Sequence, residues 1–183
     1  SHSTGTVNGS YHSVGGLVGS NYKGSVTTSY SSCTTNGAWS VGGLVGNNEG
    51  DIATCYNAGA VNGDIGVGGL VGGNLSSITM CYSTGPVTGK GDVGGLVGFN
   101  TSTNKKTTIY GNTGVSFWDL ETSGQSSSAG GTGLTTVKMQ TPSIFFEAGW
   151  DFMGEAENGT EDIWWIPEAQ SYPRLWWELI LEN

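Results

Sequence analysis

The carboxylates best placed to carry out chemistry gather near the C-terminus. Five of them surround the turn Glu157-Asn158-Gly159-Thr160, namely Asp151, Glu155, Glu157, Glu161 and Asp162. The cluster lacks the D-x-D-x-D-G order of a calcium loop. A carboxylate pair for glycoside cleavage would have to face each other across a cleft, which a sequence does not define. We therefore expect a solvated acidic loop, with weak cation binding as the alternative.

Patterns for other kinds of catalysis are missing. Both histidines, His2 and His12, fall near the N-terminus, and no HExxH or CxxC pattern occurs. The cysteines have no histidine at metal-ligand spacing, so we expect no zinc. The glycine-rich run at 130–133 is not followed by the Lys of a phosphate loop. We expect a non-enzymatic chain without cofactor or metal, with a polysaccharide-degrading β-helix as the catalytic alternative.

Tryptophans in the C-terminal part indicate binding or packing. Six of the seven follow residue 114, and four form two adjacent pairs: Trp164, Trp165, Trp176 and Trp177. Exposed aromatic rings stack on sugars, so this region is a candidate carbohydrate contact or assembly surface. Terminal repeats also need a distinct cap, and we favour that role for these tryptophans. Thr141-Pro142 predicts the start of a short helix over 143–146 within this cap.

A repeat of about 26 residues must position all of these side chains. The hexapeptide VGGLVG starts at four positions, with spacings of 27, 26 and 26 residues: Val14, Val41, Val67 and Val93. A tyrosine follows in each unit, at Tyr30, Tyr56, Tyr82 and Tyr110. A Gly-x-Val step comes after the tyrosine in the second and third units. A repeat of this length predicts a solenoid.

The pattern inside each unit predicts an all-β fold. Three short strand-like runs are separated by Asn, Gly and Ser at turn positions. Three strands in about 26 residues form one triangular coil of a parallel β-helix, whose coils stack about 4.8 Å apart. We expect Leu and Val ladders inside, a stacked tyrosine column, and glycines at positions of positive φ or close backbone approach.

Two cysteines share one phase of the repeat. Cys55 and Cys81 precede Tyr56 and Tyr82, and the other units carry Ser29 and Ile109 there. A position that accepts Ser, Cys or Ile indicates a small inward slot, so we expect buried, inert thiols. A disulfide between Cys55 and Cys81 is the alternative, although in-register parallel strands give unfavourable geometry for it.

Charge divides the chain near residue 114. Acids and bases cancel in residues 1–113, and residues 114–183 carry the whole net charge of −9. We therefore expect a solenoid over 1–113 and an acidic, Trp-rich cap or assembly region over 114–183. Nucleic acid and anionic lipid are poor partners for such a chain. No apolar run is long enough to span a membrane, so we expect no membrane insertion.

The repeat resembles the GLUG motif, which occurs in tandem in bacterial surface and secreted proteins. The resemblance rests on VGGLVG, then Asn-x-Gly, Ile-x-x-Cys-Tyr and Gly-x-Val, over residues 1–113. The segments Phe117-Trp118-Asp119 and Tyr172-Pro173-Arg174-Leu175-Trp176 are similar to those that often follow such repeats. The resemblance implies a parallel β-solenoid in an extracellular or cell-surface setting, including adhesins. It implies no catalytic residues.

The two ends of the repeat carry the functional expectation. Ser3-Thr4-Gly5-Thr6-Val7 matches Ser83-Thr84-Gly85-Pro86-Val87, so the chain begins in mid-repeat with His2 at the tyrosine phase. An uncovered first coil would present unpaired peptide groups. The apolar segment 175–181 could pair with it in another copy and build a surface filament. We expect a structural or adhesive module, with carbohydrate binding by the Trp-rich region as the alternative.

Four sequons raise the question of glycosylation. The N-x-S/T pattern occurs at Asn8, Asn74, Asn100 and Asn158. If the protein is exported by an organism that glycosylates, we expect these residues at solvent-facing turns.

Overall fold

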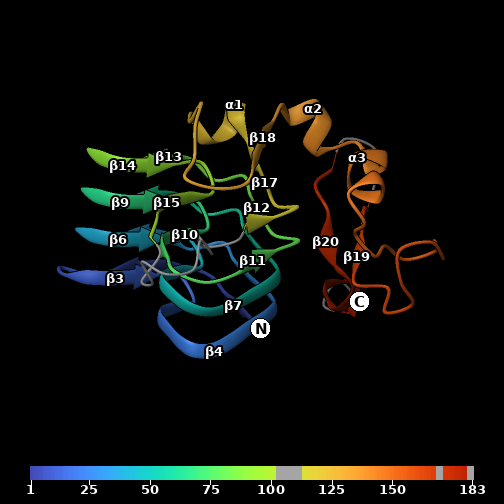
Figure 1. The fold of residues 1–183 in the computed structure, drawn as a ribbon, viewed down its shortest axis with the longest axis horizontal. Coiled ribbons are helices and arrows are strands. Elements are labelled where there is room, and N and C mark those ends of the chain that lie inside the picture. Colours follow the sequence, from blue (N-terminus) through green and yellow to red (C-terminus); the bar gives the residue numbers. More distant parts are fainter. Residues whose placement is uncertain (102–112, 168–170, 181–183) are drawn as a thin grey trace, which may run out of the picture. The chain divides into compact units, whose positions relative to one another are not determined.

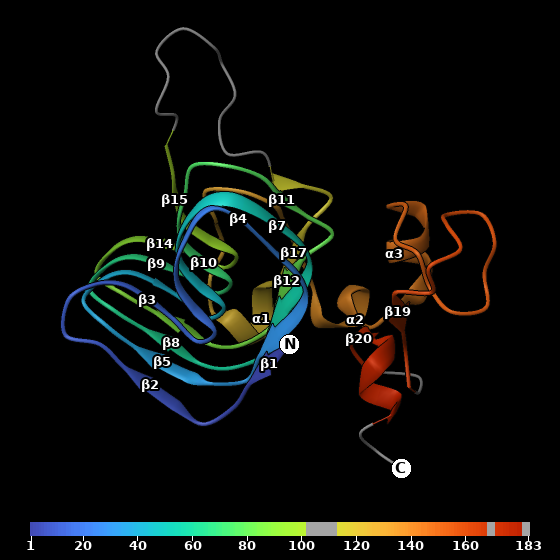
Figure 2. The same cartoon turned by 90° about the horizontal axis from the view of Figure 1, so that it is seen from below.

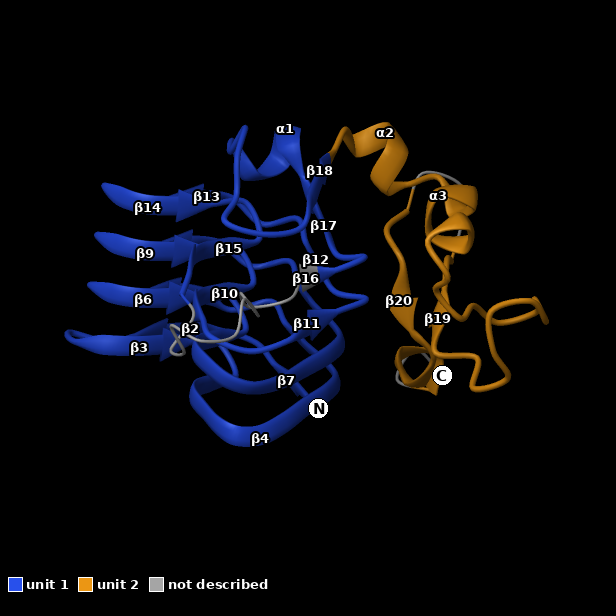
Figure 3. Ribbon diagram, in the orientation of Figure 1, with its two compact units in different colours: residues 1–133 blue, residues 134–183 orange. Residues whose placement is uncertain are grey.

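The computed structural model describes residues 1–101, 113–167 and 171–180 and divides into two compact units, residues 1–133 and 134–183 (Figure 3). The first unit is a parallel β-solenoid of about four coils, and their spacing of about 26 residues confirms the prediction from the repeat. Figures 1 and 2 show the coils stacked along one axis and the outline that each coil follows.

Three rows of parallel strands build the solenoid. The first contains β2 (Thr6–Asn8), β5 (Thr34–Asn36), β8 (Val61–Asn62) and β13 (Val87–Thr88). The second contains β3 (His12–Gly15), β6 (Trp39–Gly42), β9 (Ile65–Gly68) and β14 (Gly91–Gly94). The third is a ten-stranded sheet of β1 (His2–Ser3), β4 (Val18–Ser31), β7 (Val45–Asn57), β10 (Val71–Asn74), β11 (Ile78–Thr79), β12 (Tyr82–Ser83), β15 (Val97–Asn100), β16 (Thr113–Gly114), β17 (Phe117–Asp119) and β18 (Thr132–Leu134).

The register places equivalent residues of successive coils directly above one another. Val45 pairs with Val18 and Val71, and Val71 pairs in turn with Val97. Burial of these apolar columns is nearly complete, since Leu44, Leu70, Leu96, Val41 and Val67 expose nothing to solvent. The Leu and Val ladders predicted from VGGLVG are therefore present.

The glycines of VGGLVG are required by close backbone approach, and none of them has a positive φ. A Cβ on Gly42 would collide with the carbonyl oxygens of Val45 and Leu70 and with the nitrogen of Gly72. A Cβ on Gly43 would also collide with the Asn57 side chain of the same coil.

Positive φ occurs instead at two other columns. One lies immediately before each hexapeptide and comprises Ser13, Ser40, Gly66 and Asp92; the other comprises Thr28, Thr54, Met80 and Val115. Most of these residues carry a Cβ, so the stacked structure holds them in a conformation that L-residues rarely adopt.

Aromatic stacking continues through the coils. Ring centroids lie 5.2 Å apart for His2–Tyr30, 4.8 Å for Tyr30–Tyr56 and 4.9 Å for Tyr56–Tyr82, all nearly parallel. The assignment of Tyr110 to this column is wrong, because Tyr82 pairs with Phe117. Tyr110 and Ile109 lie outside the described residues. In the column of Cys55 and Cys81, the next coil has Ser116, which is 35 residues after Cys81. The fourth coil is longer than the period, which displaced the sequence alignment.

Asparagine side chains form a second internal ladder. Asn21 Nδ2 donates to Asn48 Oδ1 at 2.8 Å, Asn48 Nδ2 to Asn74 Oδ1 at 2.8 Å, and Asn74 Nδ2 to Asn100 Oδ1 at 2.9 Å. Because buried amides need partners, this ladder fixes the register of the coils as well as their spacing.

The first unit extends beyond residue 113, where composition predicts a junction. Phe117 and Trp118 pair with Tyr82 and Ser83 and so continue two columns of the solenoid. The Trp118 ring lies over the bare backbone of Gly95. Helix α1 (Leu120–Ser123) follows, capped by the Asp119 carboxylate. Composition changes at residue 114, whereas backbone pairing continues to the end of the first unit.

The second unit contains short elements only. They are α2 (Thr136–Met139), α3 (Pro142–Glu147), the antiparallel pair β19 (Trp164–Trp165) and β20 (Arg174–Leu175), and the 3-10 helix Trp176–Ile180. Helix α3, with Pro142 in its first turn, confirms the short helix predicted there.

Replacing one hexapeptide glycine by alanine should destabilise the whole solenoid. Gly42→Ala places a methyl group against three backbone atoms, and we expect a loss of at least about 2 kcal/mol in the free energy of unfolding. Gly91→Ala is the matched control, since the nearest atom to its Cβ would be Ile65 Cγ1 at 3.6 Å. Urea denaturation measures both. Equal stability of the two variants would contradict the close-approach account.

Candidate functional site

The two ends of the solenoid differ, and this difference defines the candidate site. At the C-terminal end, Gly95 N donates to Ser127 O at 3.0 Å and Ala129 N donates to Val97 O at 3.0 Å. Ser128 Oγ accepts from Val97 N at 2.9 Å, and Gln125 Nε2 donates to Val87 O at 2.9 Å. Residues 125–129 therefore satisfy peptide groups of the last coil at Val87, Gly95 and Val97, whereas β13 and β14 remain edge strands of their own sheets.

The N-terminal end has an open edge. Thr34 N donates to Gly5 O at 2.9 Å, toward the N-terminal side, and Trp39 N donates to Tyr11 O at 3.4 Å. Thr6 and His12 occupy the same positions one coil earlier, so their N–H groups point to the outer side of β2 and β3. Both strands are edges of their sheets, and no described strand pairs with their outer sides.

The four tryptophans of the C-terminal pairs do not form one surface. Trp164 is completely buried against Trp150, with ring centroids 4.8 Å apart, so its ring is not exposed for the carbohydrate contact considered as an alternative to packing. Trp165 and Trp177 are half-buried, and Trp165 Nε1 donates to Leu175 O at 3.1 Å. Trp176 is 44% exposed. Trp164 and Trp165 are adjacent in β19, and adjacent strand residues face opposite sides. Trp164 faces the interior of the second unit, and Trp165 faces the other way.

Only a small part of the apolar C-terminal segment forms a strand. Around this segment, only Arg174–Leu175 is paired as a strand, and Trp176–Ile180 forms a 3-10 helix. Leu175 is fully buried, and its N–H donates to the Glu178 carboxylate at 2.8 Å. The fold therefore already uses the part of this segment that would have to be donated to another coil.

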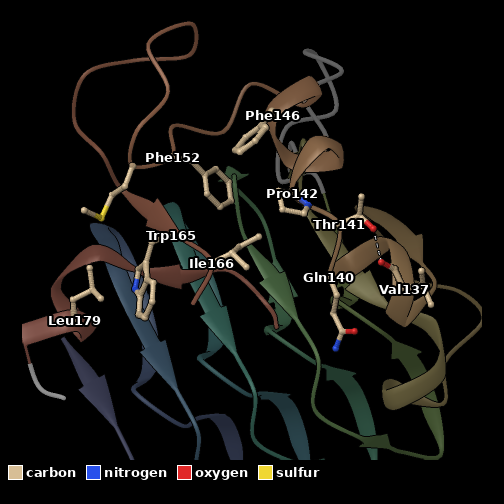
Figure 4. Close-up of a pocket in the computed structure, with 10 residues that line it drawn as sticks. Val137, Gln140, Thr141, Pro142, Phe146, Phe152, Trp165, Ile166 and Leu179 are labelled. Carbon is tan, nitrogen blue, oxygen red and sulfur yellow. Dashed lines mark hydrogen bonds between the residues drawn. The ribbon is translucent and has the colours of Figure 1, made fainter. Parts of the chain in front are cut away.

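A pocket of about 1070 Å³ opens within the second unit (Figure 4). Its wall is mainly apolar and aromatic, with Phe146, Phe152, Trp165 and Ile166 among the residues that Figure 4 labels. Thr141 Oγ1 is already committed, donating to Val137 O at 2.7 Å. The pocket brings Trp165 together with residues of α3, and it includes no other member of the two tryptophan pairs.

Carboxylates of the acidic loop accept hydrogen bonds from backbone N–H groups of the same loop. Glu155 Oε2 accepts from Glu157 N at 2.8 Å and Asn158 N at 3.1 Å. Asp151 Oδ2 accepts from Glu161 N at 2.9 Å. Burial acts to raise the pKa of Glu155, but the backbone N–H groups outweigh it and hold that pKa below its ordinary value. Within the described ranges, no group of three His, Cys, Asp or Glu side chains is arranged for a metal ion.

The cysteines act as hydrogen-bonding substitutes for serine. All three are free and buried, as expected for inert thiols. Cys55 N donates to Cys81 Sγ at 3.4 Å, and Cys81 N donates to Ser116 Oγ at 3.1 Å. Burial, followed by the neighbouring Cys55, raises the pKa of the Cys81 thiol, which disfavours the reactive thiolate.

The sequons occupy unequal environments. Asn8 is exposed, and Asn100 and Asn158 are half-buried. The expectation of a solvent-facing turn is wrong for Asn74, which is fully buried and donates its Nδ2 to Ser76 O at 2.9 Å as well as to Asn100. Glycosylation would modify this nitrogen, which is buried and hydrogen-bonded in the folded chain.

Two exposed aromatic residues of the solenoid were not singled out from the sequence. Tyr11 is 78% exposed and Trp39 is 46% exposed, and both lie at the corner between the first and second strand rows. Aligning the Asn-Gly corner of each coil, in addition to VGGLVG, would have located them.

Removing the Glu155 carboxylate should loosen the acidic loop in a pH-dependent way. The folded pKa is lowered, so the stabilisation is present above the unfolded value of 4.5 and is lost as the pH falls through the folded pKa. At neutral pH, Glu155→Gln should speed hydrogen exchange at the Glu157 and Asn158 amides, and in acid it should match the native protein. Glu161→Gln is the control and should leave both amides unchanged, whereas identical exchange in both variants would contradict this role.

Comparison with known proteins agrees with the repeat seen in the structure. Residues 37–62 and 63–88 each match the GLUG motif, and each match spans one coil, from a corner glycine to the end of the next strand in the first row. No curated protein and no solved structure is significantly similar to the chain. In the described part of the chain, no helix is long and apolar enough to cross a membrane. Two adjoining coils thus carry the motif in phase with the stacking, and the chain contains tandem GLUG-motif repeats.

Proposed function

We propose that the chain is a non-catalytic structural module of a bacterial extracellular or cell-surface protein, and that its solenoid lengthens by stacking a further coil on the N-terminal edge. The observation that carries this proposal is the outward direction of the Thr6 and His12 N–H groups at a sheet edge with matching register. An open β edge is a template for a further strand.

Side-chain columns at this edge are arranged to continue. In the internal ladder, donation runs from Asn21 toward Asn100, so a preceding asparagine would donate to Asn21 Oδ1. In the outer ladder, donation runs from Asn62 through Asn36 to Asn8, so Asn8 Nδ2 would donate onward. His2 stacks on Tyr30, so the column of rings extends to the first coil. A coil with the GLUG pattern supplies these groups.

Partial cover of the opposite end favours extension at the N-terminal edge. Residues 125–129 bond to the last coil in the third strand row, whereas no described strand covers the N-terminal side of that sheet, of β2 or of β3, and Leu175 is buried inside its own unit. An extracellular setting is supported by the GLUG repeats and by the burial of all three thiols, which shields them from oxidation. A surface filament would need a further joint besides this edge.

Adding one coil in phase tests the proposal. A copy of residues 55–80 placed before Ser1 continues the register, because Ser1, Ser29 and Cys55 occupy one column. The added coil should raise the melting temperature by several degrees, since stability in such arrays comes from neighbour interfaces. An added segment that digests as rapidly as unfolded chain and leaves the melting temperature unchanged would contradict the proposal.

The control acts on one N–H group. In the extended protein, Thr6→Pro removes the donor that faces the added coil and should abolish most of the gain, whereas Thr6→Ala keeps the donor and should preserve it. In the native chain both variants should melt alike, because the Thr6 N–H is unpaired at an edge where proline is tolerated. Equal gains in the two extended variants would rule out pairing through β2.

A further inference from the structure

A groove lies at the corner between the first and second strand rows, in the two coils nearest the N-terminal edge. Its hollow has a volume of about 460 Å³ and is lined by Asn8, Gly9, Ser10, Asn36, Gly37 and Ala38. The volume is within the range of small-ligand sites, about 300–1,000 Å³. Glycine forms the floor because a Cβ on Gly37 would collide with the inward Val14 and Val41 side chains. We call this hollow, together with the aromatic residues next to it in the chain (Tyr11, His12 and Trp39), the corner groove.

One wall of the corner groove is a row of oriented amides. Asn62 Nδ2 donates to Asn36 Oδ1 at 2.9 Å, and Asn36 Nδ2 donates to Asn8 Oδ1 at 2.8 Å. Asn36 uses one N–H and one oxygen lone pair in this row, and Asn8 uses one oxygen lone pair, which leaves further N–H groups and lone pairs for a ligand. The chain of hydrogen bonds fixes the orientation of the amides before any ligand arrives.

An aromatic cluster follows the lining residues along the chain in the first two coils. His12 and Trp39 occupy one column, with ring centroids 5.6 Å apart and planes inclined by 47°. Tyr11 lies beside His12, with ring centroids 6.4 Å apart. The first coil has one more residue at this corner than the second, because Asn8 and His12 are four apart whereas Asn36 and Trp39 are three apart. The extra loop residue lengthens the turn that carries the exposed Tyr11.

The charge of the corner groove selects an uncharged ligand. At this corner the third coil carries Asp64 and the fourth carries Lys90, and these side chains neutralise each other at 2.7 Å. The first two coils have no Asp, Glu, Lys or Arg at the corner, where residues 8–12 read NGSYH and 36–39 read NGAW. A charged partner would find no compensating group there.

We propose that the corner groove binds a neutral oligosaccharide. The apolar face of a sugar ring would pack on Trp39 and Tyr11, and its hydroxyl groups would bond to Asn8 and Asn36. Tyr and Trp supply large contact areas at low entropic cost, and Ser, Gly and Asn supply adaptable polar contacts. The groove combines these two kinds of residue on rigid strands. This site includes Asn8 of the edge strand β2 but binds its ligand on the side of the solenoid, and it does not involve the tryptophans in the second unit.

Binding to an array of neutral and charged glycans tests the proposal. The probes are cello-, malto-, manno- and chito-oligosaccharides, with polygalacturonate and hyaluronan oligosaccharides as charged comparisons. At least one neutral series should bind, and titration calorimetry should show about a tenfold weaker Kd for Trp39→Ala and for Tyr11→Ala. Both side chains are exposed, so the melting temperature of the variants should match that of the native chain.

The control is Trp176→Ala, which removes an exposed tryptophan of the second unit and should leave the Kd unchanged. Three outcomes would overturn the proposal: no neutral glycan bound at about 1 mM, binding of charged glycans only, or a Kd that depends on Trp176 and not on Trp39 and Tyr11. None of these outcomes bears on coil addition at the N-terminal edge, so the two proposals fail separately.

Discussion

Close approach of successive coils at the hexapeptide is the constraint on which the rest of the fold depends. The first three VGGLVG copies bring their backbone against a carbonyl oxygen of their own turn and against backbone atoms of the next coil, and only hydrogen fits in the place of a side chain at Gly42 or Gly68. Once this contact sets the spacing and register, every other position must accept its own equivalent above and below. The valine and leucine columns, the stacked tyrosines and the amide ladders satisfy that condition.

The same constraint explains why the ends matter for function. A stacked coil satisfies its peptide groups with two neighbours, so the first and last coils each lack one. Ser127, Ser128 and Ala129 supply the missing partners at the C-terminal end. The strands at the N-terminal end keep the register and the columns without such a cover. The side faces have a different freedom, because outward side chains do not affect stacking and can carry binding residues such as Trp39.

Periodic features could be predicted from the sequence, and features that interrupt the period could not. The apolar columns, the tyrosine stack through Tyr82 and the buried cysteines follow from residues that recur in phase. The position of Phe117 after Tyr82 in the aromatic column was not predicted, because the fourth coil is longer than the period. Composition predicted a junction near residue 114, but backbone pairing, which composition does not report, carries the first unit on to Gly133.

Burial of individual side chains was the harder part of the candidate site. Asn74 reads as a sequon, yet the internal ladder holds its amide nitrogen between neighbouring groups. Trp164 and Trp165 are adjacent in sequence, and only the fold decides that the first is interior and the second lines a pocket. Tyr11 and Trp39 occupy a corner whose shape depends on three coils stacking together.

Amide hydrogen exchange resolved by residue tests most directly whether in-register stacking holds the solenoid together. Leu44 N donates to Leu70 O at 2.9 Å and Leu70 N donates to Leu96 O at 2.9 Å, so both amides should exchange slowly and together, through opening of the whole stack. The amides of Thr6 and His12, at the open edge, should exchange fastest among the strand residues of their rows. Comparable protection of the edge and interior amides, or independent rapid exchange of Leu44 and Leu70, would contradict the account.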